Sequence, residues 1–133
     1  MRFLGIDYGT KRIGLALSDE EGQFAYPHVV LMNGPQAIEQ IATICRGEKV
    51  GEIVLGWSLN YRRQENPLMK KINLFKTALT AATNLPIVLE DEVLTTREAD
   101  QEIGPDKFTD ARAASIILRT YLAHRDLPSA SIS

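Results

Sequence analysis

The order of the apolar segments along the chain constrains the fold most. Three short apolar runs, residues 2–6, 12–17 and 24–31, come before any helical pattern. Turns built on Gly9 and on residues 18–22 separate them. Continuous apolar runs of this length indicate buried strands. Pro27 favours an edge position for the third strand, because proline cannot donate a ladder hydrogen bond. The chain therefore opens with a predicted antiparallel meander.

Helical and strand patterns then alternate. A helix opens at residues 33–35 (NGP), a fourth strand follows at 52–57 (EIVLGW), and a longer helix begins near Pro67. In both helices apolar residues recur at steps of three and four, which is typical of helices packed on a core. Asn84 is suited to end the second helix.

The last third of the chain predicts a strand and two more helices. The strand is LPIVLED, residues 85–91. Residues 95–98 (TTRE) fit a capping box and predict a short helix that ends near Gly104. Thr109 predicts the cap of a final helix over residues 110–124.

This order predicts an α/β fold with one mixed five-stranded sheet and helices on both faces. Right-handed crossovers would place the first and fourth strands side by side, which is the ribonuclease H-like arrangement. The 133 residues suffice for one domain, predicted over residues 1–125, with a flexible tail over 126–133.

Composition indicates where the protein works and which partners it can bind. The formal net charge is −2, so attraction to nucleic acid must come from local basic patches. The single cysteine, Cys45, suits a reducing cytosol and lies in a helical apolar pattern, which favours a core position. No apolar run approaches the length of a membrane span, and no signal peptide is recognisable. We expect a cytoplasmic protein with no membrane partner.

Acidic residues fall at the predicted edge of the sheet. Asp7 closes the first strand, Asp91 and Glu92 close the fifth, and Asp110 opens the last helix. Asp110 shares the apolar face of that helix, so it should point at the sheet. Ligands of open α/β sheets gather at the carboxyl ends of the strands. The four acids are therefore expected to converge there.

Such a cluster predicts a metal site. Carboxylates this close repel one another unless a cation lies between them. Oxygen ligands without His or Cys suit Mg²⁺ or Mn²⁺. Asp7 would bridge two cations roughly 3.5–4 Å apart, which align a water and a phosphodiester for in-line attack. Either Asp91 or Glu92, together with Asp110, would hold one cation each, and the predicted catalytic set is Asp7, Glu92 and Asp110.

Residues near these acids are candidates for contact with a nucleic acid. Gly9 has no side chain, so the amides of the turn can approach a phosphate closely. Basic side chains would contact the backbone phosphates. The candidate set is Gly9, Thr10, Lys11, Arg12, Arg97 and Arg112.

Each feature also has a plain structural interpretation. Asp7 followed by Gly9 is common in ordinary turns. Asp110 is favourable at a helix N-terminus without any metal, and Asp91-Glu92 fits a polar loop. His28, in the predicted edge strand, and His124, at a helix C-terminus, are interpreted as structural or surface residues.

Three segments resemble one family. Residues 5–19 (GIDYGTKRIGLALSD), 91–99 (DEVLTTREA) and 110–122 (DARAASIILRTYL) are similar to signatures of the YqgF (RuvX) family. Its members are described as Holliday junction resolvases and as pre-16S rRNA processing nucleases. The resemblance implies a ribonuclease H-like fold, a cytoplasmic location, metal-dependent nuclease chemistry in ribosome biogenesis, and functional acids at Asp7, Asp91-Glu92 and Asp110.

The chain departs from the family pattern in three places. Ser58 stands where the family usually has proline, residues 61–67 (YRRQENP) replace a glycine-containing loop, and Val93 stands where the family has arginine. The loss of that cation removes a group that would contact phosphate or orient the acidic pair.

Four functions are compatible with these patterns. The leading hypothesis is a metal-dependent endonuclease that processes the 5′ end of pre-16S rRNA, with association to a ribosomal precursor. A Holliday junction resolvase acting on branched DNA is the second, and the two-fold symmetry of a junction would favour a homodimer. The third is a non-catalytic RNA- or ribosome-binding module. The fourth is an ATP-using phosphotransferase of the actin and sugar-kinase type, which needs two such lobes.

Overall fold

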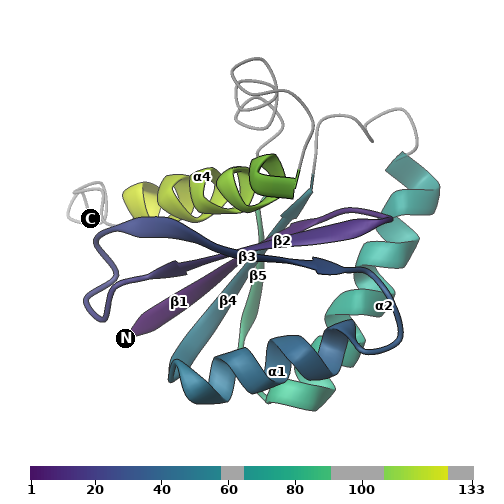
Figure 1. The fold of residues 1–133 in the computed structure, drawn as a ribbon, viewed down its shortest axis with the longest axis horizontal. Coiled ribbons are helices and arrows are strands. Elements are labelled where there is room, and N and C mark those ends of the chain that lie inside the picture. The colour runs from purple at the N-terminus through teal and green to yellow at the C-terminus, as the bar shows by residue number, and fades with distance from the viewer. Residues whose placement is uncertain (58–64, 91–106, 126–133) are drawn as a thin grey trace, which may run out of the picture.

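The computed structural model describes residues 1–57, 65–90 and 107–125 (Figure 1). Its strands are β1 (Arg2–Tyr8), β2 (Arg12–Ser18), β3 (Ala25–Met32), β4 (Val50–Trp57) and β5 (Ile87–Glu90). Its helices are α1 (Ala37–Gly47), α2 (Glu65–Thr83) and α4 (Lys107–Arg125). None of these helices, in the ranges described, has the length and apolar character needed to cross a membrane. The short helix predicted over residues 95–104 and the tail at 126–133 lie outside the described residues.

The sheet confirms the predicted topology. Its order is β3-β2-β1-β4-β5. β1 pairs antiparallel with β2 and parallel with β4, so the first and fourth strands are neighbours in the centre. β3 lies at an edge of this sheet, as Pro27 predicted. Between Leu15 and Ala16 the β2–β3 register shifts, and His28 is the extra residue of a bulge.

The helices form two layers on opposite faces of the sheet (Figure 1). α1 and α2 cover one face, and α4 covers the other. Large side chains that alternate along the strands fill the α1–α2 side, among them Leu4, Ile6, Ile13, Leu15, Ile53 and Leu55. The α4 side has a smaller cluster, built around Phe3, Ala16, Val54, Ala114, Ile117 and Leu118. The sheet is therefore buried on both faces, as its continuous apolar runs predicted.

Cys45 lies in the larger core, where only 4% of its surface is exposed. Burial raises the pKa of its thiol to about 11. The sulfur is therefore protonated at neutral pH, which disfavours a nucleophilic role. The prediction of a core cysteine is confirmed.

Several predicted boundaries were wrong by a few residues. α4 begins at Lys107, so Thr109 lies inside the first turn and not at the predicted position before the helix. α1 begins at Ala37, after the predicted opening at residues 33–35, whereas α2 begins at Glu65, near Pro67 as predicted. A capping residue contributes only about 1 kcal/mol, and proline is tolerated throughout a first turn, so neither determines the first helical residue.

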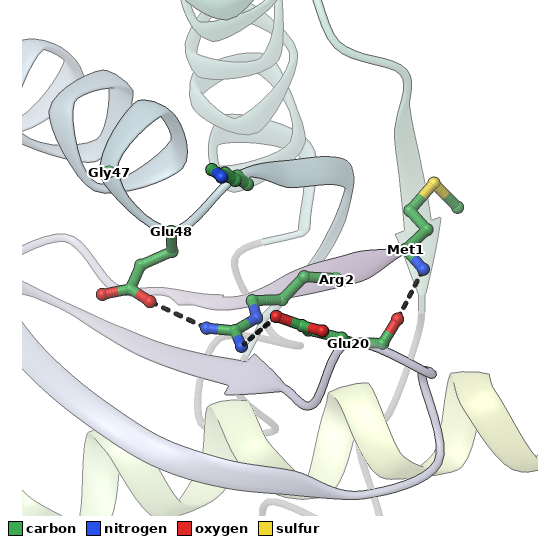
Figure 2. Close-up of a pocket in the computed structure, with 6 residues that line it drawn as sticks. Met1, Arg2, Glu20, Gly47 and Glu48 are labelled. Carbon is green, nitrogen blue, oxygen red and sulfur yellow. Dashed lines mark hydrogen bonds and ion pairs between the residues drawn. The ribbon is translucent and has the colours of Figure 1, made fainter.

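An ionic cluster ties together the elements at the N-terminal end of β1 (Figure 2). The Arg2 guanidinium donates to Glu48, just beyond α1, at 2.8 Å, and lies 3.8 Å from Glu20 in the β2–β3 turn. The N-terminal amine donates to the carbonyl oxygen of Glu20. The hollow that these residues line lies at the opposite end of β1 from Asp7, so it is not part of the predicted site.

Two helices end on residues with left-handed backbone. Asn84 follows α2 with φ 59° and donates its backbone N–H to the carbonyl of Thr80 at 2.7 Å, which confirms it as the helix stop. Lys49 adopts φ 56° two residues after α1. A lysine pays a steric cost in this conformation that glycine does not pay.

The substitution Lys49→Gly should therefore stabilise the protein by about 0.5–1 kcal/mol. Lys71→Gly on the exposed face of α2 is the matched control, and it should destabilise by about 1 kcal/mol because glycine is unfavourable inside a helix. Urea unfolding of both variants measures the free energies. Two changes of the same sign would contradict the interpretation of Lys49.

Candidate active site

Asp7 lies in a row of residues that crosses the sheet. It pairs with Gly14 of β2 on one side and with Gly56 of β4 on the other. Gly56 in turn pairs with Glu90, the last residue of β5. Paired residues of adjacent strands point to the same face. Asp7 therefore has a glycine on each neighbouring strand, and no side chain flanks its carboxylate within the row on either side.

The row faces α4, which lies very close to both glycines. A Cβ atom on Gly14 would lie 2.0 Å from the carbonyl oxygen of Asp110. A Cβ atom on Gly56 would lie 2.8 Å from Cδ1 of Ile117. The helix thus touches β2 at Asp110 and β4 at Ile117, and the segment between them passes over Asp7. Only 5% of the Asp7 surface is exposed.

Asp110 points at the sheet, as its place on the apolar helix face predicted. Its Oδ2 atom accepts a hydrogen bond from Nε of Arg12 at 2.6 Å. The side chain of Asp110 is 24% exposed and that of Arg12 is 34% exposed, so the pair is partly shielded from water. A charge-assisted bond of this kind fixes the carboxylate in orientation. Arg12, predicted to contact phosphate, already has an intramolecular carboxylate partner.

The other predicted contacts cluster at the same end of the sheet. Thr10 and Lys11 are exposed in the turn that follows β1, and Gly9 is half-buried there. Arg112 lies on the first turns of α4, also half-buried. Asn33, directly after β3, donates from its side chain to the carbonyl of Gly9 at 2.8 Å and from its backbone N–H to the carbonyl of Lys11 at 3.0 Å. These bonds link the turn to the β3–α1 loop.

Carboxylate oxygens of this kind fit a hard divalent cation such as Mg²⁺ or Mn²⁺. Asp7 and Asp110 offer carboxylates of this kind from separate elements, and Arg12 occupies Oδ2 of Asp110. Across residues 1–57, 65–90 and 107–125, no group of three His, Cys, Asp or Glu side chains is placed to hold a metal. β5 ends at Glu90, so Asp91 and Glu92 follow the strand directly. They and Arg97 lie outside the described residues, and their roles stay predictions.

Two parts of this site were not predicted from the sequence. One is the set of glycines that bring α4 close to the sheet, Gly5, Gly14 and Gly56. The signal was present, because each is a single glycine inside an apolar strand, which often marks a close backbone approach. The other is Asn33, for which the sequence carries no comparable signal because asparagine is common in loops.

The close approach at Gly14 predicts a large effect of one methyl group. Gly14→Ala should destabilise the protein by at least about 2 kcal/mol, because the new Cβ would collide with the main chain of α4. Gly34→Ala is the matched control, since nothing lies within 4 Å of a Cβ there, and its effect should stay within about 0.5 kcal/mol. Urea unfolding measures both, and equal stabilities would show that α4 does not rest on Gly14.

Sequence similarity to known proteins extends over nearly the whole chain. A protein of Maridesulfovibrio salexigens named "Putative pre-16S rRNA nuclease" is 35% identical over 133 residues, covering 92% of this chain and 98% of the relative. A protein of the same name from Syntrophus aciditrophicus is 38% identical over 132 residues, covering 92% of this chain and 88% of the relative.

Solved structures share the fold at low sequence identity. T. thermophilus RuvC in complex with a Holliday junction substrate superposes with a TM-score of 0.62 at 19% identity, covering 94% of this chain and 96% of that one. The fowlpox virus Holliday junction resolvase gives a TM-score of 0.56 at 12% identity, covering 96% of this chain and 100% of that one. These similarities confirm the ribonuclease H-like fold. The family model described as "RuvX: Holliday junction resolvase" matches residues 1–124, and the chain therefore belongs to the RuvX family.

Proposed function

We propose that this protein is a metal-dependent endonuclease that hydrolyses phosphodiester bonds near the 5′ end of a pre-16S rRNA. The observation that carries the proposal is the buried Asp7 carboxylate, whose strand partner Gly14 lies against the main chain of Asp110 at the start of α4. A carboxylate costs free energy in such a place unless charged or hydrogen-bonding groups compensate it. Membership of the RuvX family and the names of the curated relatives support nuclease chemistry and a ribosomal precursor as the substrate.

In the proposed site, Asp7 and Asp110 hold Mg²⁺ or Mn²⁺ together with Asp91 and Glu92. A cation bound there lowers the pKa of the attacking water and stabilises the leaving oxygen. Asp7 is held rigidly because α4 covers it, and rigid ligands lose little entropy when they bind. Arg12 orients Asp110 through the bond to Oδ2.

The substrate would lie across the turn after β1. The exposed Thr10 and Lys11 and the amides of the Gly9 turn would contact backbone phosphates, as would Arg12, Arg97 and Arg112. Such contacts read no base sequence, so they position the substrate and do not select it. Selection of the cleavage site would then depend on the shape of the RNA.

Removal of the Asp7 charge tests the chemistry. Asp7→Asn should lower the rate of cleavage of a pre-16S rRNA fragment by at least about 100-fold, because several kcal/mol of charge stabilisation are lost. Glu21→Gln, at an exposed position of the β2–β3 turn, removes one charge elsewhere and should cleave like the wild type. Cleavage by Asp7→Asn at the wild-type rate would remove Asp7 from the mechanism.

Thermal melting with added cation tests the metal site without any substrate. A cation at about 100 times its Kd stabilises the native state by about 2.7 kcal/mol, which is a rise of several degrees in melting temperature for a chain of this size. Wild type and Glu21→Gln should show this rise with Mg²⁺ or Mn²⁺, and Asp7→Asn should lose it. If neither cation changes the wild-type melting temperature, the result would favour a non-catalytic RNA-binding module, in which Arg12 alone neutralises Asp110.

Branched DNA is the second candidate substrate, because the matching family model is described as a Holliday junction resolvase. A panel of pre-16S rRNA, single strands and four-way junctions, cleaved by wild type and Asp7→Asn, separates the two. Symmetric cleavage of a junction requires two active sites related by a two-fold axis. Preferential cleavage of the junction by a protein that sediments as a dimer would overturn the proposed RNA substrate.

A further inference from the structure

The turn between β1 and β2 is not held closed by pairing of the two strands next to it. The β1–β2 ladder ends at the pair of Asp7 and Gly14. Beyond that pair the two strands follow different neighbours, because Tyr8 pairs with Trp57 of β4 and Arg12 pairs with Met32 of β3. The two limbs of the turn therefore separate directly beside Asp7.

Asn33 bridges these two limbs. Its side-chain Nδ2 donates to the carbonyl of Gly9 on the β1 limb at 2.8 Å. Its backbone N–H donates to the carbonyl of Lys11 on the β2 limb at 3.0 Å. One residue from a different loop thus binds a carbonyl oxygen on each side of the exposed Thr10. The backbone bond survives any substitution, whereas the side-chain bond depends on an amide donor.

We infer that Asn33 is a positioning residue, which holds the Gly9–Lys11 turn in the conformation that binds a backbone phosphate. The inference rests on the proposed function for its ligand, a phosphodiester chain. The amides of the turn and Lys11 contact the phosphate. Asn33 fixes the distance between the two limbs of the turn. Loss of the side-chain bond should weaken substrate binding more than it slows the chemical step, because none of the proposed acids lies on this turn.

The test uses two variants of the side-chain donor. Asn33→Ala removes the bond to Gly9, and Asn33→Asp replaces the donor with a carboxylate that repels the same carbonyl oxygen. Asn73→Ala, on the exposed face of α2, is the matched control. Fluorescence anisotropy with a labelled pre-16S rRNA fragment measures Kd, and each variant carries Asp7→Asn to prevent cleavage.

We expect Kd to rise about 5-fold for Asn33→Ala and further for Asn33→Asp, since one hydrogen bond contributes about 1 kcal/mol. The control should match its parent. Without Asp7→Asn, KM should rise by a similar factor and kcat should change less than about 2-fold. If Asn33 had a merely structural role, the variants would melt at a lower temperature. Their Kd, measured well below that melting temperature, would be unchanged. Kd values for both Asn33 variants within 2-fold of the control would overturn the inference.

Hydrogen exchange separates this inference from the proposed function. The amides of Thr10 and Lys11 should exchange faster in Asn33→Ala than in Asn73→Ala, whether or not any RNA is present. Unchanged exchange would show that Asn33 does not hold the turn. A wild-type chain that binds no RNA would overturn the proposed function and with it the phosphate-binding role, while the exchange rates would still show whether Asn33 anchors the turn.

Discussion

The close approach of α4 to the sheet is the constraint on which the rest of the structure depends. It is possible because three central strand positions carry no side chain on that face. A Cβ atom on Gly5 would lie 2.7 Å from Cβ of Leu118, and those on Gly14 and Gly56 would collide with Asp110 and Ile117. Helices normally pack at a distance set by the side chains between them. Here the helix backbone rests almost directly on the strands, and its first turns cover Asp7.

This packing gives the carboxylates their chemical character. Asp7 is buried away from water. Charge interactions are stronger in the protein interior than at the surface. Asp110 remains partly exposed and is held by Arg12, so its charge is balanced inside the protein. A second cation at Asp110 would have to share the carboxylate with the guanidinium. The site therefore combines one enclosed acid with one that is accessible from the end of the sheet, next to the turn of Thr10 and Lys11.

The fold followed from the sequence to a large extent. The strand order, the central pairing of β1 with β4 and the edge position of β3 are all confirmed, since strand length, turn residues and crossover handedness leave few arrangements. Helix starts were less predictable. Thr109 is a good start signal, yet α4 begins before it, because local preferences of about 1 kcal/mol yield to packing. The acids were identified as candidates, but Asp91 and Glu92 lie outside the described residues.

The sequence by itself determined which residues can be buried, which segments form strands and that Asp7 lies toward the carboxyl end of β1. These depend on periodicity and chain order, which are local properties. Only the tertiary structure decided that Arg12 binds Asp110, that α4 covers Asp7, and that Asn33 joins both limbs of the Gly9–Lys11 turn. Each of these contacts links residues at least 22 positions apart, and its geometry depends on helix-to-sheet distance and strand splay, which no local pattern encodes.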